Sequence, residues 1–205
     1  MPLIRKESDK AAAGVSRATL PSLGSASVDE RWAAARAARD PAAIPSLGEA
    51  LAHEADTRVR EAIFTALAQI ATPESALTLL PYLRVDDANT RTGAMDALRA
   101  MQDACRPYLP GLLTDTDPDV RLLACDLVRE VGGADGPSWL CALIETEPEV
   151  NVCAAAVEAL GEIADASAER SLSHCAERFP DDPFLGFAIK VIAERLRRLP
   201  LAARG

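Results

Sequence analysis

The chain has 205 residues, of which 49% are hydrophobic but only 4% aromatic, and it carries a formal net charge of −9. This composition favours helices packed through alanine and leucine, because strands prefer aromatic and β-branched residues. The acidic balance argues against a nucleic-acid partner, since such binding needs a basic surface.

The N-terminal segment predicts no targeting element. Residues 1–25 mix charges with Ala, Ser and Gly and lack apolar periodicity, so we predict a flexible tail there and a single repeat domain over 26–205. Charged residues stand where a signal peptide needs its apolar core, and no uncharged apolar run could span a bilayer. Five cysteines without a C-x-x-C pair indicate a reducing compartment. We therefore expect a cytoplasmic protein without a membrane partner.

A nearly constant sequence motif, called the repeat line below, then recurs along the chain. Copies begin with an acidic residue at Asp29, Asp56, Asp87, Asp117 and Glu149, and each continues into an alanine-rich stretch. The marker positions within them are 29, 31, 30 and 32 residues apart, at Arg31, Arg60, Arg91, Arg121 and Cys153. Such a period is typical of an array of one supersecondary unit, and arrays of this kind usually work as binding surfaces.

Each unit is predicted to be a pair of antiparallel helices. In the second unit, Asp56 caps a helix with apolar residues at helical spacing up to Ile70, and Pro73 starts the next helix. The third, fourth and fifth units repeat this pattern, the fourth with a break at Gly132-Gly133. A final helix has an apolar face and a charged outer side, which predicts a C-terminal capping helix.

The Asp-x-x-Val-Arg line with its alanine-rich continuation resembles HEAT repeats, most closely the short variety named for phycobilisome lyases. The resemblance covers roughly residues 27–195. It implies an all-α fold, a right-handed α-solenoid of about five to six antiparallel helix pairs.

The resemblance also implies a structural ladder between units. In HEAT-like arrays the aspartate and arginine of this line bridge consecutive units, and the corresponding residues here are Asp56, Arg60, Asp87, Arg91, Asp117 and Arg121. A carboxylate at a helix N-terminus also accepts backbone N–H groups. Cys153 takes the arginine position of the fifth unit, so we expect the ladder to fail between the fourth and fifth units.

The helices that begin with this line should face the concave side of the solenoid, as they do in the family. Their side chains that point away from the stack are the predicted protein-binding surface: Trp32, Arg36, Glu61, Thr65, Asp96, Leu122, Asp126 and Glu158. Its acidic residues would complement a partner with a basic contact surface. Two alternatives stay open, because these residues could form an ordinary solvated face and Trp32 could instead cover the open end of the first unit.

The sequence offers little for catalysis or metal binding. His53 and His174 are the two histidines, and a metal site needs several convergent ligands, so we predict no metal and no cofactor. Cys175, beside His174 and one turn from Arg178, is the better candidate for a reactive thiol, although a buried inert thiol fits equally. Gly132-Gly133 lacks the Lys-Ser/Thr ending of a phosphate loop.

We therefore predict a non-enzymatic scaffold or adaptor that binds a protein partner on its concave face, as a monomer or weak homodimer. By analogy, a protein of this size and style suggests an accessory of a bacterial signalling system. Two enzymatic or ligand-handling roles known on such scaffolds are the alternatives, namely a phycobilin-lyase-like chromophore-handling protein and a HEAT-like DNA glycosylase.

Overall fold

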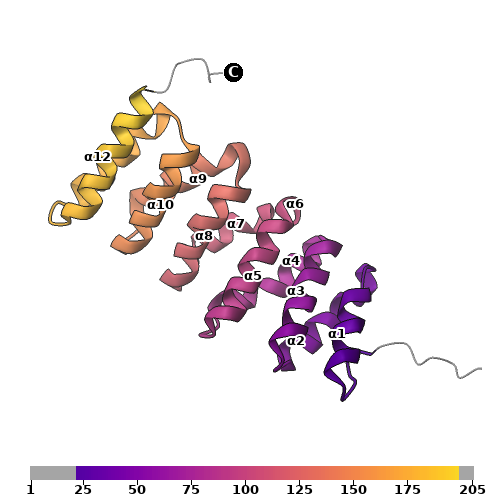
Figure 1. Cartoon of the computed structure of the whole chain (residues 1–205). Helices are drawn as coiled ribbons and strands as arrows, with labels where there is room; N and C mark the ends of the chain where they lie inside the picture. The colour runs from indigo at the N-terminus through magenta and orange to yellow at the C-terminus, as the bar shows by residue number, and fades with distance from the viewer. Residues whose placement is uncertain (1–21, 199–205) are drawn as a thin grey trace, which may run out of the picture.

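The computed structural model describes residues 22–198, and within them every regular element is helical (Figure 1). Most of the predicted tail, residues 1–25, lies outside the described residues. No helix within 22–198 is both long and apolar enough to cross a bilayer.

One layer of helices faces the viewer in Figure 1, and we call it the front layer. Each of its helices except the last is the first helix of a repeat unit. The front layer consists of α1 (Val28–Ala37), α3 (Thr57–Ile70), α5 (Ala88–Ala100), α8 (Pro118–Val131), α10 (Val150–Ile163) and α12 (Pro183–Arg198).

The second helices of the units form a back layer with shorter and more interrupted elements. Pro81, Pro107 and Pro110 each remove a backbone donor, which accounts for the short pieces in the second and third units. The back layer consists of η1 (Pro41–Ala43), α2 (Ile44–His53), α4 (Pro73–Leu79), η2 (Leu80–Arg84), α6 (Gln102–Cys105), η3 (Arg106–Tyr108), α7 (Leu109–Leu113), η4 (Gly133–Asp135), α9 (Gly136–Thr146), η5 (Ala166–Ala168) and α11 (Glu169–Arg178).

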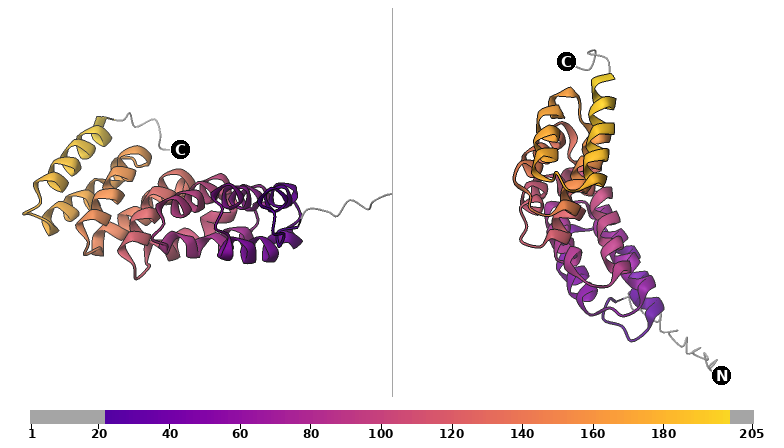
Figure 2. Two further views of the ribbon diagram at one scale, coloured as in Figure 1. Left: turned by 60° about the horizontal axis from the view of Figure 1, so that its bottom comes forward. Right: turned by 90° about the vertical axis from the view of Figure 1, so that its left-hand side faces the viewer.

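The two layers enclose one continuous core of leucines and alanines. Leu67 and Leu98 of the front layer and Leu79 and Leu140 of the back layer are fully buried. The stack curves gently, with the front layer along its inner side (Figure 2). The five pairs and the added α12 form an all-α solenoid, as the repeat pattern predicts.

The predicted helix starts agree with the structure in most units. Asp56 accepts the N–H of Val59 at 3.2 Å, and Asp87 accepts that of Thr90 at 3.0 Å. Asp117 accepts the N–H of Asp119 at 2.9 Å. Glu149 precedes α10 without a side-chain capping bond, so the fifth unit departs from the pattern at this position as well.

The last helix corrects one expectation. Leu185, Ile189 and Leu196 of α12 are buried as the apolar pattern predicts. However, the outer side of α12 is not uniformly polar, because Phe184 and Phe187 are also exposed there. The helix therefore ends the stack with an outer side that carries both the expected charged residues and exposed phenylalanines.

Candidate functional site

Arg121 holds the fourth and fifth units together. Its Nε and Nη2 donate to the two carboxylate oxygens of Glu147, both at 2.7 Å, and its Nη1 donates to the carbonyl of Asp115 at 2.8 Å. Glu147 is only 3% exposed and also accepts the N–H of Glu149 at 3.0 Å. One guanidinium thus fixes both ends of the connection, with a bidentate geometry specific to arginine.

Arg31 repeats this arrangement at the first junction. Its Nε and Nη2 donate to Glu54 at 2.8 and 3.0 Å, and its Nη1 donates to the carbonyl of Ser25 at 3.0 Å. Glu54 in turn accepts the N–H of Asp56 at 2.9 Å. The carboxylate partner of the arginine is therefore the acid two residues before the capping residue.

The ladder residues named from the sequence are thus brought together only in part. Asp56 and Asp117 cap their own helices, and the acids two residues earlier, Glu54 and Asp115, make the ion pairs instead, with Arg31 and Arg84. Arg60 and Asp87 do meet across units, at 3.5 Å, because Val85 stands where the third unit would need its acid. Arg91 donates to the Val85 carbonyl at 2.7 Å and has no carboxylate partner among residues 22–198.

The ladder does not fail between the fourth and fifth units, because Arg121 bridges them. In the fifth unit Cys153 stands at the arginine position, and an arginine of the back layer supplies the missing hydrogen bonds. Arg178 of α11 donates to the carbonyls of Ile144 and Glu147, each at 2.6 Å. The Cys153 thiol also contacts the Glu147 carbonyl, at 3.6 Å. A guanidinium from another helix therefore serves the loop that the missing arginine would have held.

These ion pairs lower the pKa values of buried or half-buried carboxyl groups. Burial alone would raise the pKa of Glu147, but the hydrogen bonds from Arg121 and the Glu149 N–H outweigh it, so its pKa lies below the ordinary value. The hydrogen bond from Arg31 lowers the pKa of Glu54, against a smaller opposing effect of burial. The hydrogen bond from Arg84 does the same for Asp115.

We expect stability to fall in acid for this reason. A carboxyl with a depressed folded-state pKa stabilises the fold above its unfolded-state pKa, about 4.3 for Glu, and this contribution is lost as the pH falls through the folded-state value. Thermal unfolding between neutral pH and pH of about 3 should therefore show a declining Tm in the acid range. Glu147→Gln should lower the Tm at neutral pH and make it less dependent on acid. An equally steep acid decline in Glu147→Gln would contradict this assignment.

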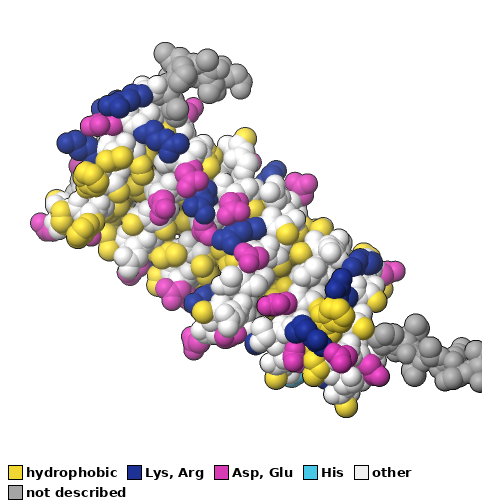
Figure 3. Space-filling view, viewed as in Figure 1, with side chains coloured by type: hydrophobic (Ala, Val, Ile, Leu, Met, Phe, Trp, Pro, Cys, Tyr) yellow, Lys and Arg dark blue, Asp and Glu magenta, His cyan; other side chains and the backbone are white. Residues whose placement is uncertain are grey.

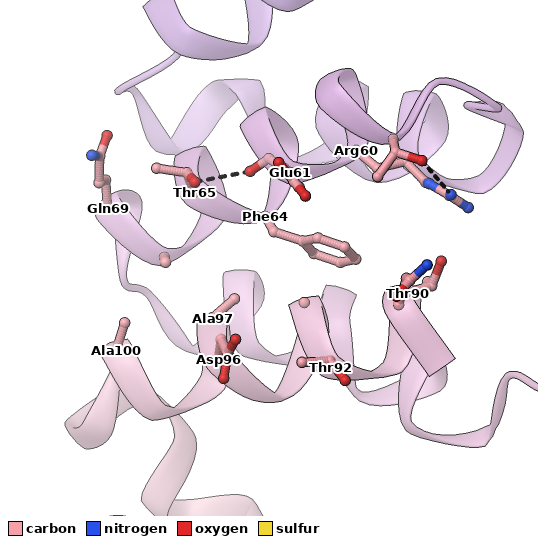
Figure 4. Close-up of a pocket in the computed structure, with 14 residues that line it drawn as sticks. Arg60, Glu61, Phe64, Thr65, Gln69, Thr90, Thr92, Asp96, Ala97 and Ala100 are labelled. Atoms are coloured by element: carbon pink, nitrogen blue, oxygen red, sulfur yellow. Dashed lines mark hydrogen bonds between the residues drawn. The ribbon is translucent and has the colours of Figure 1, made fainter. Parts of the chain in front are cut away.

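A groove between α3 and α5 lies in the front layer, beside several of the predicted contact residues. Its volume is about 920 Å³, and Glu61, Thr65 and Asp96 from the predicted surface line it (Figure 4). Phe64 lies between the two helices and forms the floor. A Cβ atom on Gly93 would lie 2.6 Å from carbons of the Phe64 ring, so only glycine allows this close approach.

Polar groups surround this floor. Besides the predicted residues, the groove is lined by Arg60, Gln69, Asn89 and Thr92. Arg60 is half-buried and occupied with Asp87, whereas Glu61 is exposed and makes no ion pair within residues 22–198. The Thr65 hydroxyl donates to the Glu61 carbonyl at 2.8 Å, which leaves the Glu61 carboxylate free toward solvent.

The acidic residues in the middle of the front layer are partly neutralised. Asp96 pairs with Arg99 at 2.8 Å, and Asp126 pairs with both Arg99 and Arg129. In Figure 3 acidic and basic side chains alternate across this part of the surface. The whole network counts four carboxylates against two guanidiniums: Asp96, Asp126, Glu130 and Glu162 with Arg99 and Arg129. Asp126 therefore links two units through its ion pair with Arg99, and it also contributes a surface charge.

Trp32 is half-exposed and held between two guanidinium groups. The guanidinium carbons of Arg36 and Arg58 lie 4.7 and 5.3 Å from the centre of the Trp32 ring, which is within cation–π range. Arg58 also pairs with Asp29. Trp32 packs against the core from α1, the first helix of the described stack. Two guanidinium groups therefore cover the Trp32 ring at this end of the front layer.

A second groove, between α10 and α12, contains Glu158 from the predicted surface. Its volume is about 630 Å³, and Asn151, Phe184 and Arg195 also line it. Glu158 is exposed and makes no ion pair in the described part of the chain. Leu122, by contrast, is half-buried on α8, packs against the core and lines neither groove. The sequence reasoning missed Phe184, whose signal was an aromatic residue on an otherwise aromatic-poor chain.

The structure buries four of the five cysteines in the core, and Cys141 is half-buried. Burial raises the pKa of the Cys105 thiol to about 11 and that of Cys125 to about 12. A hydrogen bond between Cys153 and Cys175 raises the pKa of the former and lowers that of the latter, but both side chains are fully buried. Cys175 is thus not accessible as a reactive thiol in this conformation.

The histidines lie far apart in the fold. His53 is exposed at the end of α2, and His174 of α11 lies 2.5 Å from the Glu145 carboxylate. Within residues 22–198, no group of three or more His, Cys, Asp or Glu side chains could hold a metal ion.

Comparison with known proteins gives the family. The chain matches the family model described as HEAT repeats over residues 16–99 and 105–193. Among solved structures, the crystal structure of an engineered protein from the Northeast Structural Genomics Consortium is similar, with a TM-score of 0.42 and 22% sequence identity, covering 85% of this chain and 93% of that chain. No curated protein matches. Since the family model spans most of the sequence, the chain belongs to the HEAT repeat family.

Proposed function

We propose that this chain is a non-enzymatic scaffold that binds a partner protein on its front layer, through a segment rich in lysine or arginine. HEAT repeats generally serve as protein-interaction scaffolds. The observation that carries the proposal is the groove between α3 and α5, where the free carboxylate of Glu61 lies beside the Phe64 floor. The second groove, between α10 and α12, likewise combines a free carboxylate, that of Glu158, with an aromatic side chain, that of Phe184.

The two grooves and the surface between them favour a long, basic ligand. An extended peptide could place an aliphatic stem over Phe64 and a cationic group near Glu61, since lysine and arginine combine both features. Between the grooves, the network around Asp126 keeps two more negative charges than positive ones. Arg36 beside Trp32 makes no ion pair within residues 22–198 and would disfavour a cationic ligand at the α1 end, which limits the extent of the ligand.

The proposal does not extend to a biological process or a location in the cell. The association with a bacterial signalling system and the cytoplasmic location stay predictions. Within residues 22–198 no observation favours the chromophore-handling or DNA glycosylase alternatives over partner binding.

The test is selection from a random peptide library displayed at low ionic strength. We expect the enriched peptides to carry several lysine or arginine residues and to bind more weakly as salt is added. Glu61→Lys with Glu158→Lys should reduce their affinity at least about tenfold, because each change replaces attraction by repulsion. Both side chains are exposed and make no described ion pair, so the fold should be unaffected.

The control makes the same change of charge on the back layer. Glu49 on α2 and Glu177 on α11 are exposed, and Glu49→Lys with Glu177→Lys leaves the front layer intact. This control should retain full affinity. Equal weakening by both double variants would reduce the effect to net charge and refute a front-layer site, as would enrichment of acidic peptides.

A further inference from the structure

The outer side of α12 carries an apolar stripe that begins at Phe184, at the edge of the groove between α10 and α12, and continues away from that groove. Phe184 is 86% exposed, Phe187 70% and Val191 49%. Their spacing of three and four residues places them on one face of the helix, opposite buried Leu185 and Ile189. Hydrophobic side chains gather over α12 in Figure 3, at the upper left of the molecule. Three large apolar residues together on an exposed helix face mark an interaction surface.

The position of α12 explains why this stripe is uncovered. The helix packs against α10 and α11 on its inner side, and no further helix of the described chain lies beyond it (Figures 1 and 2). In the interior of a solenoid, the equivalent face of each helix is covered by the next unit.

Charges at the two ends of the stripe are of opposite sign. Asp181 precedes the helix, and Arg195 and Arg198 lie near its end on the same side as the stripe. Asp181 and Arg195 are exposed and make no ion pair within residues 22–198, and Arg198 has only a 3.9 Å contact with Glu194. An antiparallel copy of the helix would bring each end against its opposite charge, whereas a parallel copy would bring like charges together.

We propose that α12 pairs antiparallel with α12 of a second copy of this chain, about a twofold axis near the middle of the helix. Phe184, Phe187 and Val191 of the two copies then form the shared apolar centre. Asp181 of each copy lies beside Arg195 and Arg198 of the other. The interface is self-complementary, as a twofold dimer requires. A single helix pair is smaller than a standard interface, so the dimer should dissociate on dilution in the micromolar range.

Sedimentation velocity of the full chain over a micromolar concentration series tests the pairing. We expect a reversible dimer in the unmodified protein. Phe184→Ser with Phe187→Ser should weaken the dimer at least about tenfold, because it removes the apolar centre. Leu77→Ser is the matched control, since Leu77 is 50% exposed on α4, far from α12, and this variant should dimerise normally. Circular dichroism checks that each variant keeps its helices.

Charge reversal tests the orientation. Asp181→Arg alone and Arg195→Asp with Arg198→Asp should each dimerise poorly, because like charges then meet at both ends of the helix pair. A mixture of the two variants should form a heterodimer, since every contact is again between opposite charges.

A protein that stays monomeric at high micromolar concentration would overturn the proposal and assign the stripe to another occupant. A dimer that survives Phe184→Ser with Phe187→Ser, or charge variants that fail to complement, would overturn it as well. Phe184 and Arg195 also line the groove between α10 and α12, whereas the groove between α3 and α5 lies apart from this surface. Glu61→Lys alone should therefore leave the dimer unchanged.

Discussion

Arg121→Ala is expected to lower the free energy of unfolding by about 3 kcal/mol, the largest loss from any single ion pair in the described chain. The change leaves the Glu147 carboxylate, which is 3% exposed, without its bidentate partner. It also removes the bond that holds the Asp115 carbonyl. For a chain of this size the Tm should fall by roughly 10 °C, measured by circular dichroism or calorimetry.

Arg58→Ala provides the comparison. Arg58 and Asp29 also form an ion pair between units, but both side chains are largely exposed, so its loss should cost less than about 1 kcal/mol. Arg121→Met with Glu147→Leu should recover much of the loss from Arg121→Ala, since no charge is then left buried. If Arg58→Ala and Arg121→Ala cost the same, the buried pair has no special role in holding the units together.

The structure also changes what is expected of Arg91. The sequence placed Arg91 opposite a ladder carboxylate, so its loss would have left a carboxylate unpaired. In the structure Arg91 holds only the Val85 carbonyl, and Arg91→Ala should cost about 1 kcal/mol, the value of one hydrogen bond.

The repeat period predicted the fold because it reports a property of every unit. The capping aspartates and the leucines at helical spacing act within one helix, so they can be read locally. Asp56 and Asp87 therefore cap as expected, and Leu67 and Leu98 are buried as expected.

The ladder partners were harder to assign because they depend on the loop between two units. Glu54, Asp115 and Glu147 each stand two residues before the capping position of a unit's first helix, a regularity present in the sequence. The resemblance to HEAT repeats assigned the ladder to the capping acid, because that acid belongs to the repeated motif. Only the path of the loop shows that the earlier carboxylate faces an arginine of another unit. The partners are Arg31 for Glu54, Arg84 for Asp115 and Arg121 for Glu147.

The contact surface could be predicted as a set of positions but not as a site. Asp96 and Asp126 are on the expected face, yet both are ion-paired. Asp96 pairs with Arg99 of its own helix, and Asp126 pairs with Arg129 of its own helix and with Arg99 of the preceding unit. Glu61 stays free because its neighbour Arg60 is directed to Asp87. Such choices among nearby charges depend on distances between helices, which a single sequence does not contain.

Cys153→Arg is expected to destabilise the protein by about 3 kcal/mol, although it restores the repeat's own arginine. The thiol is fully buried beside Cys175 and the Glu147 carbonyl. Arg178 already serves the loop that this arginine would serve. The new guanidinium would therefore be buried against another one, and no carboxylate stands two residues before the capping residue of α12, where residue 180 is a proline. Chemical denaturation of the variant measures the loss.

Arg178→Ala in the same chain decides between crowding and a simple loss of packing. Alone, Arg178→Ala should destabilise by about 2 kcal/mol, because it frees the Ile144 and Glu147 carbonyls. Together with Cys153→Arg, the loss should be clearly smaller than the sum, because the new arginine can then take the position that Arg178 leaves. Strict additivity would mean that the two guanidiniums do not compete. A stabilising Cys153→Arg would mean that the fifth unit follows the same arginine rule as the others, and that Arg178 is not its substitute.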